Sequence, residues 1–199
     1  LFGLLITYAA LTFFQFVIAD ADKRHIRRAF GYYVAPSLLA EIERNADRLK
    51  QLFPTFAARV AAVIAELEDE GWRPRIQDAW RSIAAQESAY TTGHSKLKFG
   101  FHNVTGADDR PEALAVDLLD DDAPLNPGKP YLLRLAGAAA NAGLDSGIRW
   151  GLSARMAKAV DTAIANREWQ AAVKIGWDPT HLQPRGLTVA QARAGMRPS

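Results

Sequence analysis

Three side chains in the second half of the chain could together bind a catalytic metal ion. The chain has four histidines and no cysteine, so imidazole nitrogens and carboxylate oxygens would have to hold the metal. Catalytic zinc commonly has three protein ligands and a fourth position for water. His102, Asp117 and His181 satisfy that count, although a lone histidine is more often an ordinary surface or core residue.

A carboxylate stands three residues before the last of these histidines. At that spacing Asp178 can lie beside a metal held by His181 without binding it. It could then accept a proton from the attacking water and pass it to the leaving amine. Asp before Pro is also a common turn signal, so a turn residue is the alternative interpretation.

The segments around these residues resemble a known family of enzymes. They are GHSKLKFGFHNVTGADDRPEALAVDLLD at 93–120, SGIRWG at 146–151 and WDPTHLQP at 177–184. They resemble the D-alanyl-D-alanine carboxypeptidase and L-alanyl-D-glutamate endopeptidase family of zinc peptidases, which includes phage endolysins. The resemblance covers roughly residues 55–183. It implies a Zn²⁺ cofactor, a peptidoglycan peptide as substrate, His102, Asp117 and His181 as metal ligands, and Asp178 as general base.

The first ligand block departs from the family pattern. In the family a Ser-x-His-x-x-Gly-x-Ala-x-Asp block supplies one His and one Asp ligand. Here Gly100 takes the Ser position, and fifteen residues instead of seven separate His102 from Asp117. We expect an insertion at residues 104–111, whose Thr, Gly, Asp and Pro content is typical of a surface loop. The departure leaves His94 as a competing first ligand, or as a hydrogen-bonding residue near the metal.

The resemblance also assigns residues to the substrate side of the site. Arg81 matches an arginine that points at the substrate, where a guanidinium could bind a carboxylate or stabilise the oxyanion. Gln86 and Ser95 are candidate substrate contacts, although such side chains are usually solvated. Trp150 and Trp177 match an aromatic wall beside the metal, with core packing as the alternative.

Short helices and strands are expected to position these residues. Apolar spacing predicts a helix from Pro54 that Gly71 ends, and PRIQDAW reads as a strand. ALAVDLL alternates like a strand and places Val116 and Asp117 on opposite faces. Further helices are expected over residues 82–90, 131–142 and 153–166. This order indicates an α+β fold with a small antiparallel sheet and flanking helices, and the resemblance implies a DD-peptidase/Hedgehog-like arrangement.

The N-terminal segment predicts a membrane anchor. Residues 1–19 carry no charge, and as a helix they would be about 28 Å long, close to the hydrocarbon thickness of a bilayer. A buried core helix is the alternative, but such a helix usually keeps a polar stripe. The basic cluster that follows, at residues 23–28, would lie on the cytoplasmic side.

Residues 20–52 are predicted to be a basic juxtamembrane connector that contains a connector helix. Together with residues 1–19, and through FGYYVAPSLL, they resemble the membrane and juxtamembrane segment of CHASE-type sensor adenylate cyclases, but the cyclase domain is missing. The predicted segments are thus a transmembrane helix at 1–19, a connector at 20–52, a zinc peptidase domain at 53–183 and a C-terminal extension at 184–199. We expect a membrane-anchored protein of the cell envelope, although the basic cluster favours a cytoplasmic C-terminal side.

The function expected is a zinc metallopeptidase that hydrolyses peptide bonds in peptidoglycan stem peptides or crosslinks. The net charge of +2 gives no field that would indicate nucleic-acid binding. Carboxypeptidase and endopeptidase action both stay open, with the phage-like sequence favouring the endopeptidase. The alternatives are a membrane sensor fragment with an inactive domain, whose structural zinc would have four protein ligands, and a peptidoglycan-binding module without hydrolysis.

Overall fold

The computed structural model describes residues 45–199, and Arg44–Ser199 form one compact unit. Within the described residues no helix is both long enough and apolar enough to cross a bilayer. The predicted transmembrane helix at residues 1–19 and most of the predicted connector lie outside the described residues. So does the segment that resembles the sensor cyclases, apart from residues 45–52.

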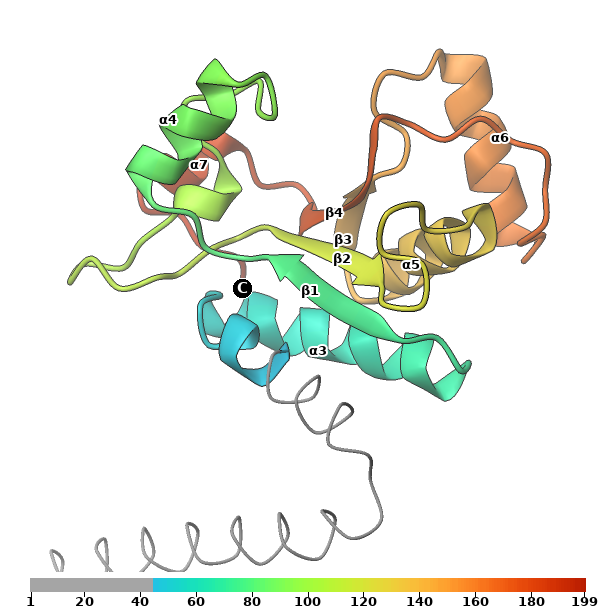
Figure 1. The fold of residues 1–199 in the computed structure, drawn as a ribbon, viewed down its shortest axis with the longest axis horizontal. Helices are drawn as coiled ribbons and strands as arrows, with labels where there is room; N and C mark the ends of the chain where they lie inside the picture. Colours follow the sequence, from blue (N-terminus) through green and yellow to red (C-terminus); the bar gives the residue numbers. More distant parts are fainter. Residues whose placement is uncertain (1–44) are drawn as a thin grey trace, which may run out of the picture. The chain divides into compact units, whose positions relative to one another are not determined.

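A four-stranded antiparallel sheet forms the centre of the unit (Figure 1). Its strands, in spatial order, are β1 (Pro74–Asp78), β2 (Val116–Asp120), β4 (Asp178–Pro184) and β3 (Leu144–Gly147). Every neighbouring pair is antiparallel. The strand that comes last in the chain is therefore an inner strand, between β2 and β3. With its flanking helices this sheet confirms the predicted α+β class.

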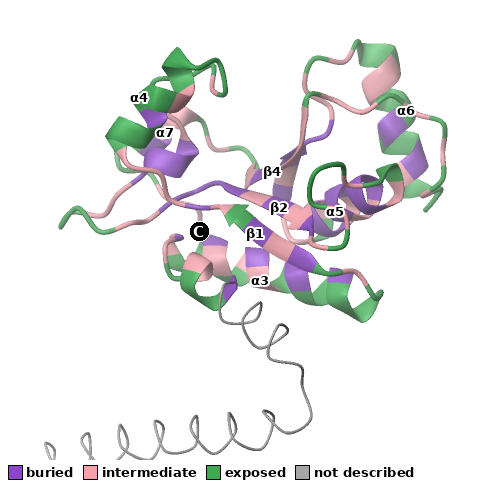
Figure 2. Ribbon diagram, viewed as in Figure 1, coloured by how far each residue is buried: buried purple, intermediate pink, exposed green. Residues whose placement is uncertain are grey.

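Two helices supply much of the core that lies against the sheet. Helix α3 (Pro54–Asp69) begins with proline, whose missing N–H costs nothing at a helix start, and Gly71 follows its end with a φ of +87°. Its buried residues are those that the spacing predicts: Phe56, Val60, Val63, Ile64 and Leu67. Helix α5 (Lys129–Asn141) packs against α3, β3 and β4, and α6 (Ala154–Ala165) packs on α5. Figure 2 shows the buried residues gathered in the sheet and along α3 and α5.

The elements nearest the predicted site follow local sequence signals. Helix α4 (Ile83–Thr91) begins after Ser82, whose hydroxyl accepts a hydrogen bond from the Ala85 N–H as an N-cap. In β2 the side chains alternate as predicted, with Val116 fully buried and Asp117 partly exposed. The core therefore fixes one face of β2 and leaves Asp117 on the other.

Strands β3 and β4 were not expected from the sequence. Strand β3 reads LDSG and β4 begins with Asp-Pro, and both contain residues that are rare in strands. Asp178 therefore begins a strand instead of forming a turn. Strand β3 pairs with β4, and β4 also pairs with β2. Both strands therefore depend on tertiary contacts and not on their own sequence.

Two glycines allow the backbones near the start of β4 to approach closely. A Cβ atom at Gly147 would lie 2.1 Å from the Asp178 carbonyl oxygen, and one at Gly176 would lie 2.6 Å from the Ile148 carbonyl oxygen. No side chain fits between these segments. The close approach therefore fixes the backbone position from which Asp178 projects.

The residues that follow β4 pack on the same unit. Helix α7 (Val189–Arg193) is capped by Thr188 and buries Ala192 in the core. The Arg197 guanidinium donates to the Thr105 carbonyl oxygen at 2.8 Å, and Arg59 donates to the Ser199 carbonyl oxygen at 2.6 Å. Residues 184–199 thus contact both α3 and the loop at residues 104–111.

Candidate metal centre and active site

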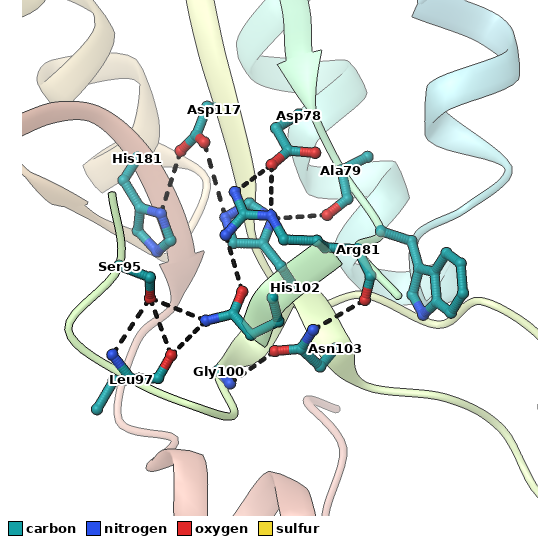
Figure 3. Close-up of polar contacts among 12 residues, drawn as sticks. Asp78, Ala79, Arg81, Ser95, Leu97, Gly100, His102, Asn103, Asp117 and His181 are labelled. Atoms are coloured by element: carbon teal, nitrogen blue, oxygen red, sulfur yellow. Dashed lines mark hydrogen bonds and ion pairs between the residues drawn. The ribbon is translucent and has the colours of Figure 1, made fainter. Parts of the chain in front are cut away.

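His102, Asp117 and His181 come from three separate elements and meet at one point. The short 3-10 helix η1 (Phe101–Asn103) carries His102, while β2 carries Asp117 and β4 carries His181. Asp117 and His181 lie directly opposite each other in the β2–β4 ladder. One ligand atom from each of the three residues lies within 4.8 Å of the others, and Figure 3 shows the three side chains converging.

Hydrogen bonds orient the two imidazole rings. His102 Nδ1 lies 2.6 Å from the Ala79 carbonyl oxygen, and because a carbonyl only accepts, Nδ1 carries the proton. The lone pair of His102 is therefore on Nε2, which lies 3.8 Å from Asp117 Oδ2. On the other side, His181 Nδ1 lies 3.2 Å from Asp117 Oδ1.

The spacing of these atoms fits a zinc ion. Two ligand atoms at the usual bond lengths of a tetrahedral zinc are about 3.3 Å apart. The separations from the two imidazoles to the Asp117 carboxylate, 3.8 Å to Oδ2 and 3.2 Å to Oδ1, lie close to that value. Two imidazoles and one carboxylate also form a donor set that zinc prefers. The three residues could therefore hold zinc with small side-chain adjustments.

The insertion before Asp117 leaves the metal group intact. Residues 107–110 are exposed, and the loop closes through a bridge between Thr105 and Pro111 and a hydrogen bond from the Gly106 N–H to the Arg110 carbonyl oxygen. Residues 101–103 and 116–120, on either side of it, carry His102 and Asp117. The long interval between these two residues is thus taken up at the surface, as the loop composition predicts.

His94, the competing first ligand, is not part of the metal group. Its side chain is exposed, and Nδ1 lies 3.0 Å from Thr92 Oγ1. It lines the same cavity as the group described above. Within residues 45–199 the structure therefore groups His102, and not His94, with Asp117 and His181.

The two histidines have opposite pKa shifts in the metal-free protein. Burial lowers the pKa of His102, and the attraction of Asp117 only partly opposes it. Burial acts the same way on His181, but the hydrogen bond to Asp117 and the charges of Asp117 and Asp178 raise its pKa overall. Burial would raise the pKa of Asp117, yet the hydrogen bond from His181 and the charge of His102 lower it. Of the two histidines, His181 therefore holds a proton more firmly than His102 does.

Zinc affinity should therefore depend on pH through a single histidine. Below the raised pKa of His181 a proton competes with the metal, whereas the lowered pKa values of His102 and Asp117 make proton competition there weaker. We expect affinity to rise about tenfold per pH unit just below the raised pKa of His181 and to level off above it. Zinc titrations by competition with a chelator of known affinity would measure this slope. A rise of about a hundredfold per unit would show instead that both histidines lose a proton.

A cavity of about 550 Å³ opens over the metal group. Every site residue predicted from the sequence lines it: Arg81, Gln86, Ser95, His102, Asp117, Trp150, Trp177, Asp178 and His181. Asp178 is partly buried there, and burial together with the charge of Asp117 raises its pKa above the ordinary value. No hydrogen bond or ion pair within residues 45–199 engages its carboxylate. Its oxygens are thus available to a substrate or water in the cavity.

Arg81 is held in place by a residue that the sequence analysis missed. Its Nε donates to Asp78 Oδ2 at 3.0 Å, one Nη also contacts that oxygen, and the other donates to Gln86 Oε1 at 2.8 Å. Figure 3 shows the guanidinium beside Asp78. These contacts leave two of the five N–H donors of arginine for other partners. Asp78 ends β1 three residues before Arg81, and this acid–base spacing was the only sequence signal for it.

Gln86 and Ser95 use their polar atoms within the protein. Gln86 is only 2% exposed, and its Nε2 donates to Ser95 Oγ at 2.8 Å and to the Leu97 carbonyl oxygen at 2.5 Å. Ser95 Oγ donates to the same carbonyl at 3.0 Å. Both residues therefore tie the segment at 95–97 to Arg81, while direct contact with substrate stays a prediction.

Two tryptophans form one wall of the cavity. The Trp150 ring lies 5.1 Å from the His181 ring and 5.4 Å from the Trp177 ring, measured between centroids. Trp177 is 52% exposed, so core packing does not describe its environment. The Lys96 ammonium lies 4.5 Å above the Trp177 ring. The wall thus runs from the metal group to the rim of the cavity.

Several solved structures are similar to this chain. No protein-family model and no curated protein matches it. One similar solved structure is the L-Ala D-Glu endopeptidase ChiX of Serratia marcescens, with 17% identity over 71% of this chain and 86% of that one and a TM-score of 0.46. The LdcB LD-carboxypeptidase has 20% identity over 73% of this chain and 72% of that one, with a TM-score of 0.39. A VanY D,D-pentapeptidase variant in complex with Zn(II) has 14% identity over 70% of this chain and 74% of that one, with a TM-score of 0.36. All three are peptidases by name.

Proposed function

We propose that this chain is a zinc-dependent peptidase that hydrolyses peptide bonds in peptidoglycan stem peptides or crosslinks. The observation that carries the proposal is the group of His102, Asp117 and His181 at the base of a cavity that also holds the unengaged carboxylate of Asp178. Three protein ligands facing a cavity are typical of catalytic zinc, whereas structural zinc has four. The arrangement therefore favours hydrolysis over a purely structural metal.

Each residue of the cavity has a role in this reaction. Zinc, when bound, would supply Lewis-acid activation of a water molecule and of the scissile carbonyl. Asp178 accepts a proton from the attacking water and returns it to the leaving amine. Arg81, fixed by Asp78 and Gln86, directs its two remaining N–H donors at the oxygen on which negative charge develops. Trp150 packs beside His181 and limits the access of water to that side of the ligand group.

The substrate class is supported by the sequence segments around the site. GHSKLKFGFHNVTGADDRPEALAVDLLD, SGIRWG and WDPTHLQP resemble peptidoglycan peptidases, and each segment contributes residues to the cavity wall. Between the two bond types we favour the L-alanyl-D-glutamate bond. Cleavage within a chain needs an open groove, and Leu97 and Trp177 on the cavity wall are 51% and 52% exposed.

The location of the protein is proposed from residues 1–28 alone. Their apolar run and basic cluster support a membrane anchor and a place in the cell envelope. Cleavage of peptidoglycan would then require the domain to face the wall, which is the opposite of the orientation that the basic cluster favours.

The test is zinc content and hydrolysis measured on the full chain. We expect about one zinc per chain and the release of new amino groups from purified peptidoglycan. A chain that binds neither zinc nor peptidoglycan would reject the proposal and favour the sensor fragment. Binding of peptidoglycan by the zinc-loaded chain without release of amino groups would reject hydrolysis and establish a binding module instead.

A further inference from the structure

We propose that Lys96 binds a free carboxylate on the substrate residue that follows the scissile bond. The inference rests on the proposed peptidase function and names the feature by which its cavity selects a substrate. In a terminal D-alanyl-D-alanine the residue after the scissile amide ends in an α-carboxylate. In an L-alanyl-D-glutamate unit extended through the glutamate side chain, the α-carboxylate of the glutamate is likewise free. Both candidate bonds therefore place a carboxylate on the carbon that bears the leaving nitrogen.

Lys96 is positioned to meet such a group. It lines the cavity, and its ammonium lies 4.5 Å above the centroid of the Trp177 ring. A cation held over a ring face keeps its N–H donors for other partners. Within residues 45–199 no carboxylate forms an ion pair with Lys96. The segment that carries it is anchored on both sides, at Ser95 and Leu97, by hydrogen bonds from the buried Gln86.

Lys96 is the permanent cation of the cavity wall that has no ion pair among residues 45–199. Arg81, the other permanent cation on the wall, is already paired with Asp78. Asp117 is engaged by His181 and His102, and the Asp178 carboxylate lines the cavity without an ion pair to Lys96. A substrate carboxylate that enters the cavity would therefore find its unpaired positive partner at Lys96.

In this proposal the leaving side of the scissile bond lies along the part of the cavity that holds Trp177 and Lys96. Asp178 returns its proton to the leaving amine, so the residue that departs lies on the side of Asp178. Trp177 immediately precedes Asp178 and lines the same cavity. A departing residue that lies along the part of the wall formed by Trp177 and Lys96 would bring its carboxylate to the ammonium.

The test compares two peptides that differ in one group. Both contain the scissile bond, and the α-carboxyl of the residue after it is either free or converted to a carboxamide. We expect the wild-type full chain to prefer the free carboxylate by about tenfold in kcat/KM, mainly through KM. The Lys96→Met variant should lose this preference and cleave the carboxamide peptide as well as wild type does. Lys96→Arg should retain most of it.

Lys98 provides a matched control on the same segment. Its ammonium lies 5.4 Å from the Tyr90 ring, and it does not line the cavity, so Lys98→Met should keep the wild-type preference. Cleavage of both peptides with an unchanged preference in Lys96→Met would overturn the role of Lys96 while leaving the peptidase intact. If the wild type cleaves neither peptide nor peptidoglycan, the proposed function itself fails, and the role of Lys96 fails with it.

Discussion

Replacing Asp178 with asparagine should lower kcat for peptidoglycan hydrolysis by about 10²–10⁴-fold while the zinc content stays near the wild-type value. The amide has the same size but cannot accept a proton from water or return one to the leaving amine. Asp178 is also outside the group of ligand atoms formed by His102, Asp117 and His181, so its loss removes no metal ligand. Release of amino groups and zinc analysis of the same preparation would measure both quantities.

A neighbouring aspartate serves as the control for this experiment. Asp145 lies on β3, beside β4, and pairs with Arg185 outside the cavity. Asp145→Asn should therefore leave kcat within a factor of about two, as expected for a surface ion pair. Loss of zinc together with activity in Asp178→Asn would make Asp178 a metal ligand. An unchanged kcat in that variant would remove its role as the base.

The second large effect is expected at the first metal ligand. His102→Ala should lower zinc affinity by more than about 100-fold, because second-shell changes alone cost up to that amount, and should abolish hydrolysis at micromolar zinc. His94→Ala should keep zinc and most activity, since His94 is exposed and bonded to Thr92. Chelator competition would give the affinities, and far-UV circular dichroism of the metal-free variants would check their folding.

This pair of variants decides between the two histidines that the sequence left open. Stripping the wild type with a chelator should reproduce the inactivity of His102→Ala, and added zinc should restore activity to the wild type alone. The reverse pattern, with zinc lost in His94→Ala and kept in His102→Ala, would assign the first ligand to His94. It would also require the segment at 93–100 to move relative to the group seen here.

Residues with strong local signals could be placed from the sequence. The apolar face of α3, the proline and glycine at its ends and the alternation of β2 all appear in the structure as expected. The alternation was informative because the buried core selects one face of β2, which leaves Asp117 on the other. Apolar periodicity and capping therefore sufficed for the elements whose stability depends on their own burial pattern.

Elements that depend on distant partners could not be placed in this way. Strand β3 has only four residues and contains Asp and Gly, so nothing in its own composition indicates a strand. Strand β4 is held by β2 and β3, which are remote in sequence. The same limit applies to side chains. Gln86 is buried and hydrogen-bonded to Ser95 because residues 95–97 fold over α4, and the local sequence does not specify that fold.

The register between β2 and β4 links the metal group to the completion of folding. Val116 faces Leu182 in the core, and the adjacent pair, Asp117 and His181, supplies two of the three metal ligands. A slip of one residue would turn His181 toward the core and separate the ligands, so zinc binds only the correct pairing of β2 and β4. At a free zinc concentration of 100 times Kd, zinc would stabilise the folded state by about 2.7 kcal/mol. Because β4 is the last of the four strands in the chain yet lies between two others, it must insert between β2 and β3. During synthesis the chain would therefore acquire its metal site, and with it any activity, only after residues 178–184 have left the ribosome.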